Sequence, residues 1–348
     1  MAARIRALES LPYIVGVNPF ISRLYTIYRE SLDALLREKE VTTLEENDEF
    51  VRRLQGLVES HANDIPIMAK GFQECKRYMT PSAVSAFLDG AIRSRIGTRL
   101  IGEQHVAISR SLSHPTPGQV GVVQTDLKPR EMIQHCAAFV AELCESTLGV
   151  VPQLVVDGMV DATFSYIPVH LEYILTELLK NAYRATAEHH LRLPTPTPPS
   201  ITLTLSRTPS FLSFRIRDGG GGIAPAHLAH VFSYAFTTAG VEDGGPYAMQ
   251  HVGGQAALDA GAPPPPSPST SPSLSPAPAL AESVFTEISA TSLRSSMGTI
   301  AGLGYGLPLA RLYASYFGGG LELVSLYGHG TDVFVKLRSL EGGADVLL

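Results

Sequence analysis

The chain has 348 residues, of which 45% are hydrophobic, and this is enough to bury one large core or two medium ones, so we expect two domains. A net charge of −6 without basic runs speaks against nucleic acid or anionic lipid as a partner, and no apolar run approaches the roughly 20 residues that span a bilayer. The three cysteines lack the paired spacing of a zinc site or a disulfide framework. Composition therefore favours a soluble enzyme in a reducing compartment.

The first ten residues allow two interpretations. Arg4 and Arg6 precede the first acidic residue, Glu9, and this pattern is typical of the start of a mitochondrial presequence. The same residues also fit the first helix of a domain. The sequence does not decide between the two.

The first 150 residues otherwise predict helices. Four segments have apolar residues at helical spacing or favourable starting prolines: residues 20–37, residues 47–78, a segment from Pro81 to just before Pro115, and a segment that begins at residues 125–129. Long helices joined by short loops predict an antiparallel four-helix bundle over residues 1–150, which would serve as a docking or dimerisation scaffold.

One histidine of the third predicted helix is a candidate phosphate acceptor. A neutral imidazole is nucleophilic near pH 7, so His105 could accept a phosphoryl group if it were exposed. A structural role is the more common case for a lone histidine on a helix.

After residue 150 the hydrophobic pattern changes from a helical period to a strand period. Short strands are expected at 151–157 and 161–165. Apolar residues alternate in two predicted hairpins, one over 201–218 and one made of LELVSL and TDVFVKL. Antiparallel hairpins interleaved with helices predict an α+β fold over residues 151–348, with helices on one face of a mixed sheet.

One predicted helix between these strands combines an apolar face with a polar face. In IPVHLEYILTELLKNAYRATAEHHL, apolar residues recur every three or four positions, as in a buried helical face. Its other face carries Tyr173, Glu177, Asn181, Arg184 and Glu188. Such a polar stripe is most often a solvated surface, so its meaning depends on the rest of the chain.

Two glycine-rich segments give the stripe a functional meaning. The strand FRIR ends at Asp218 and leads into GGGGI, so a carboxylate stands where backbone can approach a ligand closely. Further on, GLGYGLP (residues 302–308) leads into an apolar helix, whose N-terminus can offer amide donors and its dipole to phosphates. Neither segment has the spacing of a Walker loop or of a dinucleotide-binding GxGxxG turn.

The segment between the two glycine-rich motifs has an unusual composition. It contains PPPPSPSTSPSLSPAPA, and proline and serine at this density cannot form a packed core, so we expect disorder. Long loops inside compact domains are usually lids or insertions. This part therefore predicts a Pro/Ser-rich insertion into a lid, at about residues 241–300.

In their order along the chain, ELLKNAYRA, DGGGGI, GLGYGLP and GTD resemble the motifs of the GHKL (Bergerat) ATP-binding fold, which histidine kinases, MutL and type II topoisomerases share. Over nearly the whole chain the resemblance is to the mitochondrial kinases of pyruvate dehydrogenase and branched-chain 2-oxoacid dehydrogenase. Further segments carry it, including LPYIVGVNPF, HANDIPIMAKG, SRIGTRLIGEQH, YAFTTAG and SLYGHGTDVFVKLRSLEG. It implies a helical bundle followed by a GHKL α/β sandwich, and a protein serine kinase of the mitochondrial matrix.

The resemblance implies that the polar helix face carries the chemistry. Glu177 would accept or orient the proton of the attacking serine hydroxyl, and Asn181 would bind the Mg ion of Mg-ATP. Lys180 and Arg184 would neutralise charge or order Glu177, with ordinary surface cations as the alternative.

The resemblance also implies the nucleotide contacts. Asp218 would accept a hydrogen bond from the adenine amino group, supported by Thr331, while Gly220 and Gly222 would let adenine lie against backbone. The other ATP contacts would come from the two ends of the lid, namely Thr237, Thr238, Gly302, Leu303, Gly304, Tyr305, Gly306 and Leu307. Carbonyl groups near Val231, Ser233 and Phe236 would hold a K ion.

Two departures from the family pattern bear on the substrate. Tyr173 stands one turn before Glu177, where pyruvate dehydrogenase kinases carry a histidine, and the chain ends at GGADVLL without their long C-terminal tail. Both features favour the branched-chain type. HANDIPIMAKG and AGLGYGLP are closer to the pyruvate type, which is the alternative. Because tyrosine cannot become cationic, we expect no pH regulation through position 173.

The implied function is phosphorylation and inactivation of the decarboxylase (E1) α subunit of a 2-oxoacid dehydrogenase complex. The implied partners are a lipoyl domain of the acyltransferase, bound by the bundle, and a second copy of the chain. A histidine kinase that phosphorylates its own His105 and a noncatalytic ATP-driven clamp are the alternatives.

Overall fold

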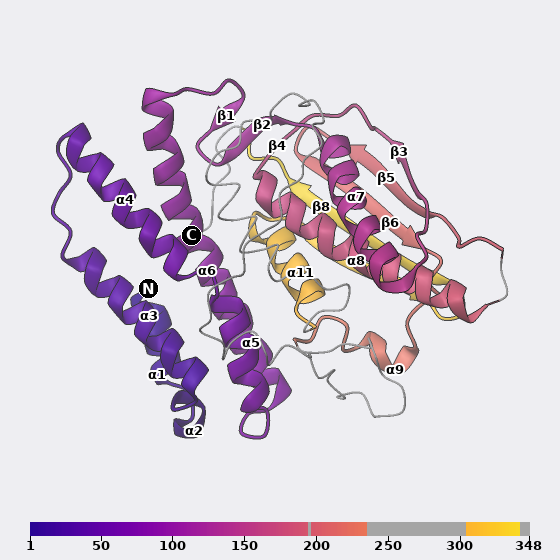
Figure 1. Cartoon of the computed structure of the whole chain (residues 1–348), viewed down its shortest axis with the longest axis horizontal. Helices are drawn as coiled ribbons and strands as arrows, with labels where there is room; N and C mark the ends of the chain where they lie inside the picture. Colours follow the sequence, from indigo (N-terminus) through magenta and orange to yellow (C-terminus); the bar gives the residue numbers. More distant parts are fainter. Residues whose placement is uncertain (194–195, 235–303, 342–348) are drawn as a thin grey trace, which may run out of the picture.

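The computed structural model describes residues 1–193, 196–234 and 304–341, and shows a group of helices beside a sheet that other helices cover (Figure 1). The helices are α1 (Ala2–Glu9), α2 (Tyr13–Gly16), α3 (Pro19–Leu36), α4 (Leu44–Ser60), α5 (Asp64–Glu74), α6 (Pro81–Ser113), α7 (Pro129–Leu148), α8 (Pro168–Arg192), α9 (Pro225–Leu228) and α11 (Gly306–Tyr316). The strands are β1 (Gln119–Val120), β2 (Val123–Leu127), β3 (Leu154–Gly158), β4 (Phe164–Tyr166), β5 (Ile201–Arg207), β6 (Phe211–Asp218), β7 (Gly320–Leu326) and β8 (Gly330–Arg338). The predicted Pro/Ser-rich insertion lies outside the described residues.

The N-terminal helices pack in pairs, with α3 against α5, α4 against α6 and α1 against α3. Arg4 of α1 is buried, lies 5.7 Å from the centre of the Phe87 ring and donates a hydrogen bond to the carbonyl of Gly90 in α6. The first residues therefore form a packed helix of the fold, as the second interpretation of their sequence predicted.

The single helix predicted over 47–78 is wrong, because α4 and α5 are separate helices. Asp64 is fully buried, and its Oδ2 lies 2.8 Å from Nδ1 of His61. Arg95 of α6 donates a hydrogen bond to the carbonyl of His61 at 3.1 Å. The guanidinium thus satisfies a carbonyl that a continuous helix would have used, and the chain turns at this point.

The fourth predicted helix does not complete a bundle. Thr125, expected near its start, lies in β2, which pairs with β1 and β4 in a small antiparallel sheet. The helix α7 begins at Pro129 and packs along α8. The predicted four-helix bundle over residues 1–150 is therefore not confirmed, and we propose that the domain boundary lies after α6.

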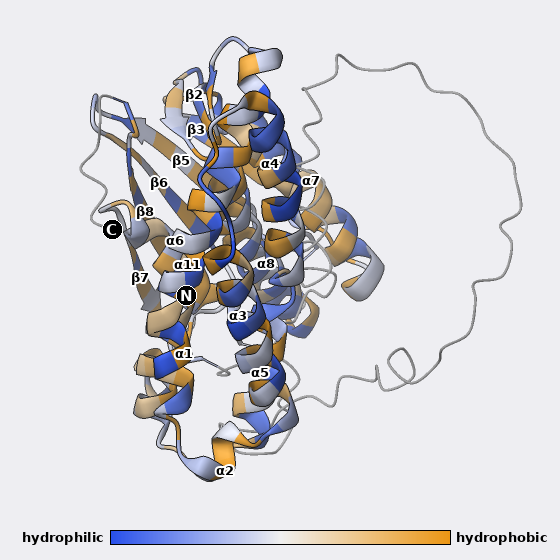
Figure 2. Ribbon diagram, turned by 90° about the vertical axis from the view of Figure 1, so that its left-hand side faces the viewer, coloured by the Kyte–Doolittle hydropathy of each residue, from blue (hydrophilic) through white to orange (hydrophobic). Residues whose placement is uncertain are grey.

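The larger sheet has the strand order β3-β5-β6-β8-β7, with β3 and β5 parallel and the other neighbours antiparallel. The predicted hairpins and the mixed sheet are thus confirmed. Alternate residues of β5 and β6, such as Leu203 and Phe214, are buried beneath α8. Hydrophobic and hydrophilic residues alternate along the strands and helices, as expected for elements that bury one face (Figure 2).

The helix α11 packs on β7 and β8, and it also contacts both α8 and α6. It therefore lies where the N-terminal helices meet the layer of helices on the sheet (Figure 1). Among the described residues, no helix is long and apolar enough to cross a membrane.

Candidate active site

A buried ion pair lies at the centre of α8. The Glu177 side chain is 12% exposed and the Lys180 side chain 4%, and Nζ of Lys180 lies 3.2 Å from Oε1 of Glu177. Residues three positions apart share one face of a helix, which makes this pairing local. Lys180 therefore compensates the Glu177 charge and fixes the direction of the carboxylate.

The other carboxylate oxygen of Glu177 lies against the start of α11. A Cβ atom at Gly306, the first residue of α11, would collide with Oε2 of Glu177. Gly304, two residues earlier, has a φ of 76°, a left-handed conformation that glycine adopts without strain. The unpaired N–H groups and positive dipole end of α11 thus begin directly beside Glu177, where they can bind phosphate oxygens.

Tyr173, one turn before Glu177, is buried rather than part of an exposed polar stripe. Its ring centre lies 5.1 Å from that of Tyr313 in α11. Burial, followed by the negative charge of Glu177, raises the pKa of Tyr173 well above its ordinary value. The phenol is therefore neutral at physiological pH, and the absence of pH regulation through position 173 stays a prediction.

At the end of β6, Asp218 is tied into the sheet edge. It pairs in register with Thr331 of β8, and its Oδ1 accepts hydrogen bonds from the backbone N–H of Gly220 at 2.9 Å and of Thr331 at 3.2 Å. Burial raises the pKa of Asp218 to about 6, against the lowering effect of these two donors. Within the described part of the chain, Oδ2 accepts no hydrogen bond, so it can accept one from an amino group of a ligand.

The glycines after Asp218 bring this carboxylate to α8. A Cβ atom at Gly220 would collide with Ala185 of α8, one turn beyond Asn181. Gly222, with a φ of 70°, lies against the backbone of Leu326. A hydrogen bond of 2.7 Å from the N–H of Ile223 to Oγ of Ser325 fixes the loop further. Only residues without a side chain allow this approach, which places Asp218 beside the C-terminal half of α8, about one turn beyond Asn181.

The remaining predicted residues of α8 differ in their surroundings. Asn181 is exposed, so its amide oxygen is available to a metal ion. Arg184 lies 3.8 Å from Glu188. Among the described residues, Lys180 is the cation that pairs with Glu177.

The residues predicted around the lid are placed only in part. Tyr305 is buried and Leu307 packs partly against the core, so their backbone is the part that can face a nucleotide. Val231 and Ser233 lie in the turns after α9. The others fall outside the described residues, namely Phe236, Thr237, Thr238, Gly302 and Leu303.

His105 is poorly suited to accept a phosphoryl group. Its Nε2 is buried and has no hydrogen-bond partner among the residues that the structure describes. Its ring lies edge-on to Phe50 of α4, with the ring centres 5.2 Å apart. The imidazole is therefore half-buried at the interface of α4 and α6, with its Nε2 covered.

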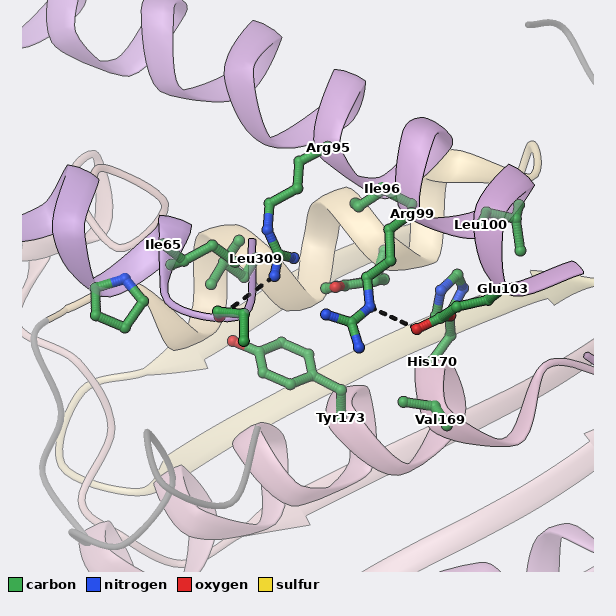
Figure 3. Close-up of a pocket in the computed structure, with 13 residues that line it drawn as sticks. Ile65, Arg95, Ile96, Arg99, Leu100, Glu103, Val169, His170, Tyr173 and Leu309 are labelled. Carbon is green, nitrogen blue, oxygen red and sulfur yellow. Dashed lines mark hydrogen bonds and ion pairs between the residues drawn. The ribbon is translucent and has the colours of Figure 1, made fainter. Parts of the chain in front are cut away.

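Sequence reasoning missed a small cavity of about 50 Å³ between α5, α6, α8 and α11. Figure 3 shows Arg95 and Arg99 of α6 directed towards His170 and Tyr173 of α8. Burial, followed by the positive charge of Arg99, lowers the pKa of His170 to about 3, so His170 is neutral. The three-residue spacing of His170 and Tyr173 places them on one helix face, but only the packing of α6 shows what covers that face.

Comparison with known proteins agrees with this geometry. Residues 1–124 match the family described as mitochondrial branched-chain alpha-ketoacid dehydrogenase kinase, and residues 166–254 match the histidine kinase-, DNA gyrase B- and HSP90-like ATPases. The chain is similar to a mitochondrial pyruvate dehydrogenase kinase of Arabidopsis thaliana, with 29% identity over 98% of this chain and 81% of that protein. It is 28% identical to pyruvate dehydrogenase kinase 1 of Saccharomyces cerevisiae, over 96% of this chain and 74% of that protein. It is also 28% identical to human pyruvate dehydrogenase kinase isozyme 4, over 98% of this chain and 74% of that protein.

The chain belongs to the mitochondrial 2-oxoacid dehydrogenase kinases of the GHKL superfamily. It is thus a protein kinase, and its GHKL part implies ATP as the phosphoryl donor. The residues of the kinase fit that donor, because three groups lie along one side of α8: the exposed amide of Asn181, the N-terminus of α11 and the Asp218 carboxylate, whose Oδ2 accepts no hydrogen bond from the described residues.

Proposed function

We propose that the kinase transfers the γ-phosphoryl group of ATP to a serine of the decarboxylase α subunit of the pyruvate dehydrogenase complex, in the mitochondrial matrix. The observation that carries this proposal is the position of Glu177, held by Lys180 on one side and against Gly306 at the start of α11 on the other. A carboxylate at that place can receive a proton from a hydroxyl group that attacks a phosphate bound by α11.

Each residue of the site then has one task. Glu177 takes the serine proton as the new O–P bond forms and the bond to the leaving ADP breaks. Asn181 supplies an oxygen ligand to Mg, which when bound neutralises charge on the β- and γ-phosphates. The α11 N-terminus binds phosphate oxygens, and Asp218 accepts the adenine amino hydrogen bond, supported by Thr331. Carbonyl groups of Val231 and Ser233 remain candidates for a K ion.

The substrate assignment replaces the branched-chain preference of the sequence analysis. That preference rested on Tyr173 and on the end of the chain. Several pyruvate dehydrogenase kinases are similar to this chain over nearly its whole length, which supports the pyruvate alternative better. The branched-chain family matches residues 1–124 only, so the branched-chain decarboxylase is the second candidate substrate.

Two exposed apolar surfaces support the proposed partners. Tyr13 and Ile14 of α2 are exposed and offer a contact for a lipoyl domain on the N-terminal helices. Val324, Leu326 and Phe334 are exposed on the sheet face that is turned away from α8 and α11, where a second copy of the chain could pack.

The test is incubation with labelled ATP and each purified decarboxylase in turn. We expect acid-stable label on a serine of the pyruvate decarboxylase α subunit. Preferential labelling of the branched-chain enzyme would overturn the substrate assignment, acid-labile label on the kinase itself would support a histidine kinase, and hydrolysis without labelled protein would support a clamp. Glu177→Gln keeps the shape of the side chain, so it should bind Mg-ATP and lose phosphoryl transfer.

A further inference from the structure

The helix α6 contacts the C-terminal end of α11. A Cβ atom at Gly97 of α6 would collide with the hydroxyl of Tyr316, and the guanidinium of Arg93 lies 5.4 Å from the centre of the Tyr316 ring. These contacts hold the C-terminal half of α11. The N-terminal half carries Gly306, which lies against Glu177 of α8, and a separate anchor ties it to α6.

That anchor is a pair of tyrosines. Tyr305, immediately before α11, has its ring centre 5.2 Å from that of Tyr234, and both side chains are buried. The hydroxyl of Tyr234 donates a hydrogen bond of 2.7 Å to Oδ1 of Asp89 in α6. Nearby, the guanidinium of Arg311 lies 4.3 Å from the centre of the Phe232 ring, which ties the same two segments together a second time.

We propose that Asp89 is a positioning residue for phosphoryl transfer: through Tyr234 and Tyr305 it holds the start of α11 against Glu177. This inference rests on the proposed role of Glu177 and α11 in the nucleotide site. It makes a residue of the N-terminal helices part of the support of the catalytic geometry. The direction of the hydrogen bond is fixed, because burial and the contact with Asp89 raise the pKa of Tyr234 and keep its phenol protonated.

The chain of contacts explains why a remote residue would affect catalysis. Gly306 directly follows Tyr305, so a change in the position of the Tyr305 ring moves the first turn of α11. Glu177 lies in contact with that turn. Displacement of catalytic groups by about 1 Å can lower a rate by as much as roughly a hundredfold, so loss of one anchor is expected to be measurable.

The experiment compares Tyr234→Phe, Asp89→Ala, Asp89→Asn and the double variant Tyr234→Phe/Asp89→Ala in the full chain. Tyr234→Phe keeps the ring contact with Tyr305 and removes only the hydroxyl that donates to Asp89. Asp89→Asn keeps an oxygen that can accept this hydrogen bond. We expect Tyr234→Phe and Asp89→Ala each to lower kcat/KM about tenfold, the scale of one hydrogen bond to a charged group. The double variant should be no worse than either single one, and Asp89→Asn should restore most of the activity.

The matched control is Tyr25→Phe, which removes a phenol donor 3.0 Å from Oε1 of Glu9 within the N-terminal helices. It should leave kcat/KM unchanged. Unchanged kinetics in Tyr234→Phe, or additive losses in the double variant, would overturn the positioning role even if the melting temperature fell. A wild-type chain that does not bind Mg-ATP in calorimetry would instead overturn the proposed function on which the inference rests.

Discussion

The Glu177 carboxylate lies directly against the Cα atom of Gly306, with no room for a methyl group between them. The φ angle of Gly306 is not in the left-handed region, so alanine can adopt this backbone, and alanine favours helices more than glycine does. Gly306→Ala should therefore displace the Glu177 carboxylate and lower kcat about a hundredfold, while the melting temperature changes little. Initial-rate kinetics and thermal unfolding of the same samples test this.

The control for that variant is Gly56→Ala in α4, where nothing lies within 4 Å of the added Cβ atom. It makes the same chemical change in a helix far from Glu177 and should leave kcat unchanged. If Gly306→Ala were as active as Gly56→Ala, the contact would have no catalytic meaning.

Asn181 is exposed, so its proposed role as a ligand of Mg can be tested without removing a side chain from the core. Asn181→Ala should change the free energy of unfolding by less than about 0.5 kcal/mol and weaken Mg-ATP binding at least tenfold. Asn181→Asp, which keeps an oxygen ligand, should retain more of the affinity. Titration calorimetry with and without Mg separates the contribution of Asn181 to metal binding from any direct contact with ATP. Equal Mg-ATP affinity in wild type and Asn181→Ala would remove Asn181 from the metal site.

Local pattern was sufficient to predict the elements that carry the site. The alternation of apolar and polar residues in β5 and β6 predicted the hairpin that ends at Asp218. Apolar residues at helical spacing predicted α8, with Glu177 and Asn181 one turn apart. These features depend on neighbours in sequence. They could be predicted because a strand or an amphipathic helix imposes its period on nearby residues.

The features that were missed depend on contacts between distant segments. Arg95 binds the carbonyl of His61 and interrupts a helix that looked continuous, and Tyr173 is buried because α11 covers it. The same holds for the hydrogen bond between Asp89 and Tyr234. No spacing rule connects such residues, so only the folded chain shows them.

We expect the affinity for ATP to depend on pH, because we propose that Asp218 accepts a hydrogen bond from the adenine amino group. Burial raises its folded-state pKa from an ordinary 3.8 to about 6, so its contribution to stability is present below about pH 4 and is lost as the pH rises through 6. An adenine amino donor favours the carboxylate form, so Mg-ATP affinity should be nearly constant above pH 7 and fall below pH 6, by at most about tenfold per pH unit. Asp218→Asn should bind more weakly and lose this dependence.

Calorimetry across that pH range tests the assignment, and the variant corrects for the titration of the ATP phosphates themselves. Proton release on binding near pH 6, measured in buffers of different ionisation enthalpy, should be larger in wild type than in Asp218→Asn. Identical pH profiles for the two proteins would show that Asp218 does not contact the nucleotide.

His170 affects the pH dependence of stability in the opposite direction to Asp218, because it makes the folded chain less stable in acid. Its folded-state pKa is lowered to about 3 from an ordinary 6.5, because it is buried between the rings of Tyr313 and Phe317 and faces the charge of Arg99. The unfolded chain therefore binds a proton that the folded chain excludes, so the stability that His170 supports is complete above about pH 6.5 and is lost as the pH falls towards 3. Between pH 7.5 and 5 the loss should reach about 2 kcal/mol.

Replacement by a ring that cannot be protonated should remove this loss. In His170→Phe, the decrease in unfolding free energy between pH 7.5 and 5 should be smaller than in wild type by about 2 kcal/mol, as measured by denaturant titration at both pH values. His135 of α7 is exposed, so His135→Phe is the matched control and should keep the wild-type dependence. The titration of Asp218 is common to all three proteins and cancels in the comparison. Equal pH dependence in all three would mean that His170 takes up its proton in the folded state as readily as in the unfolded chain.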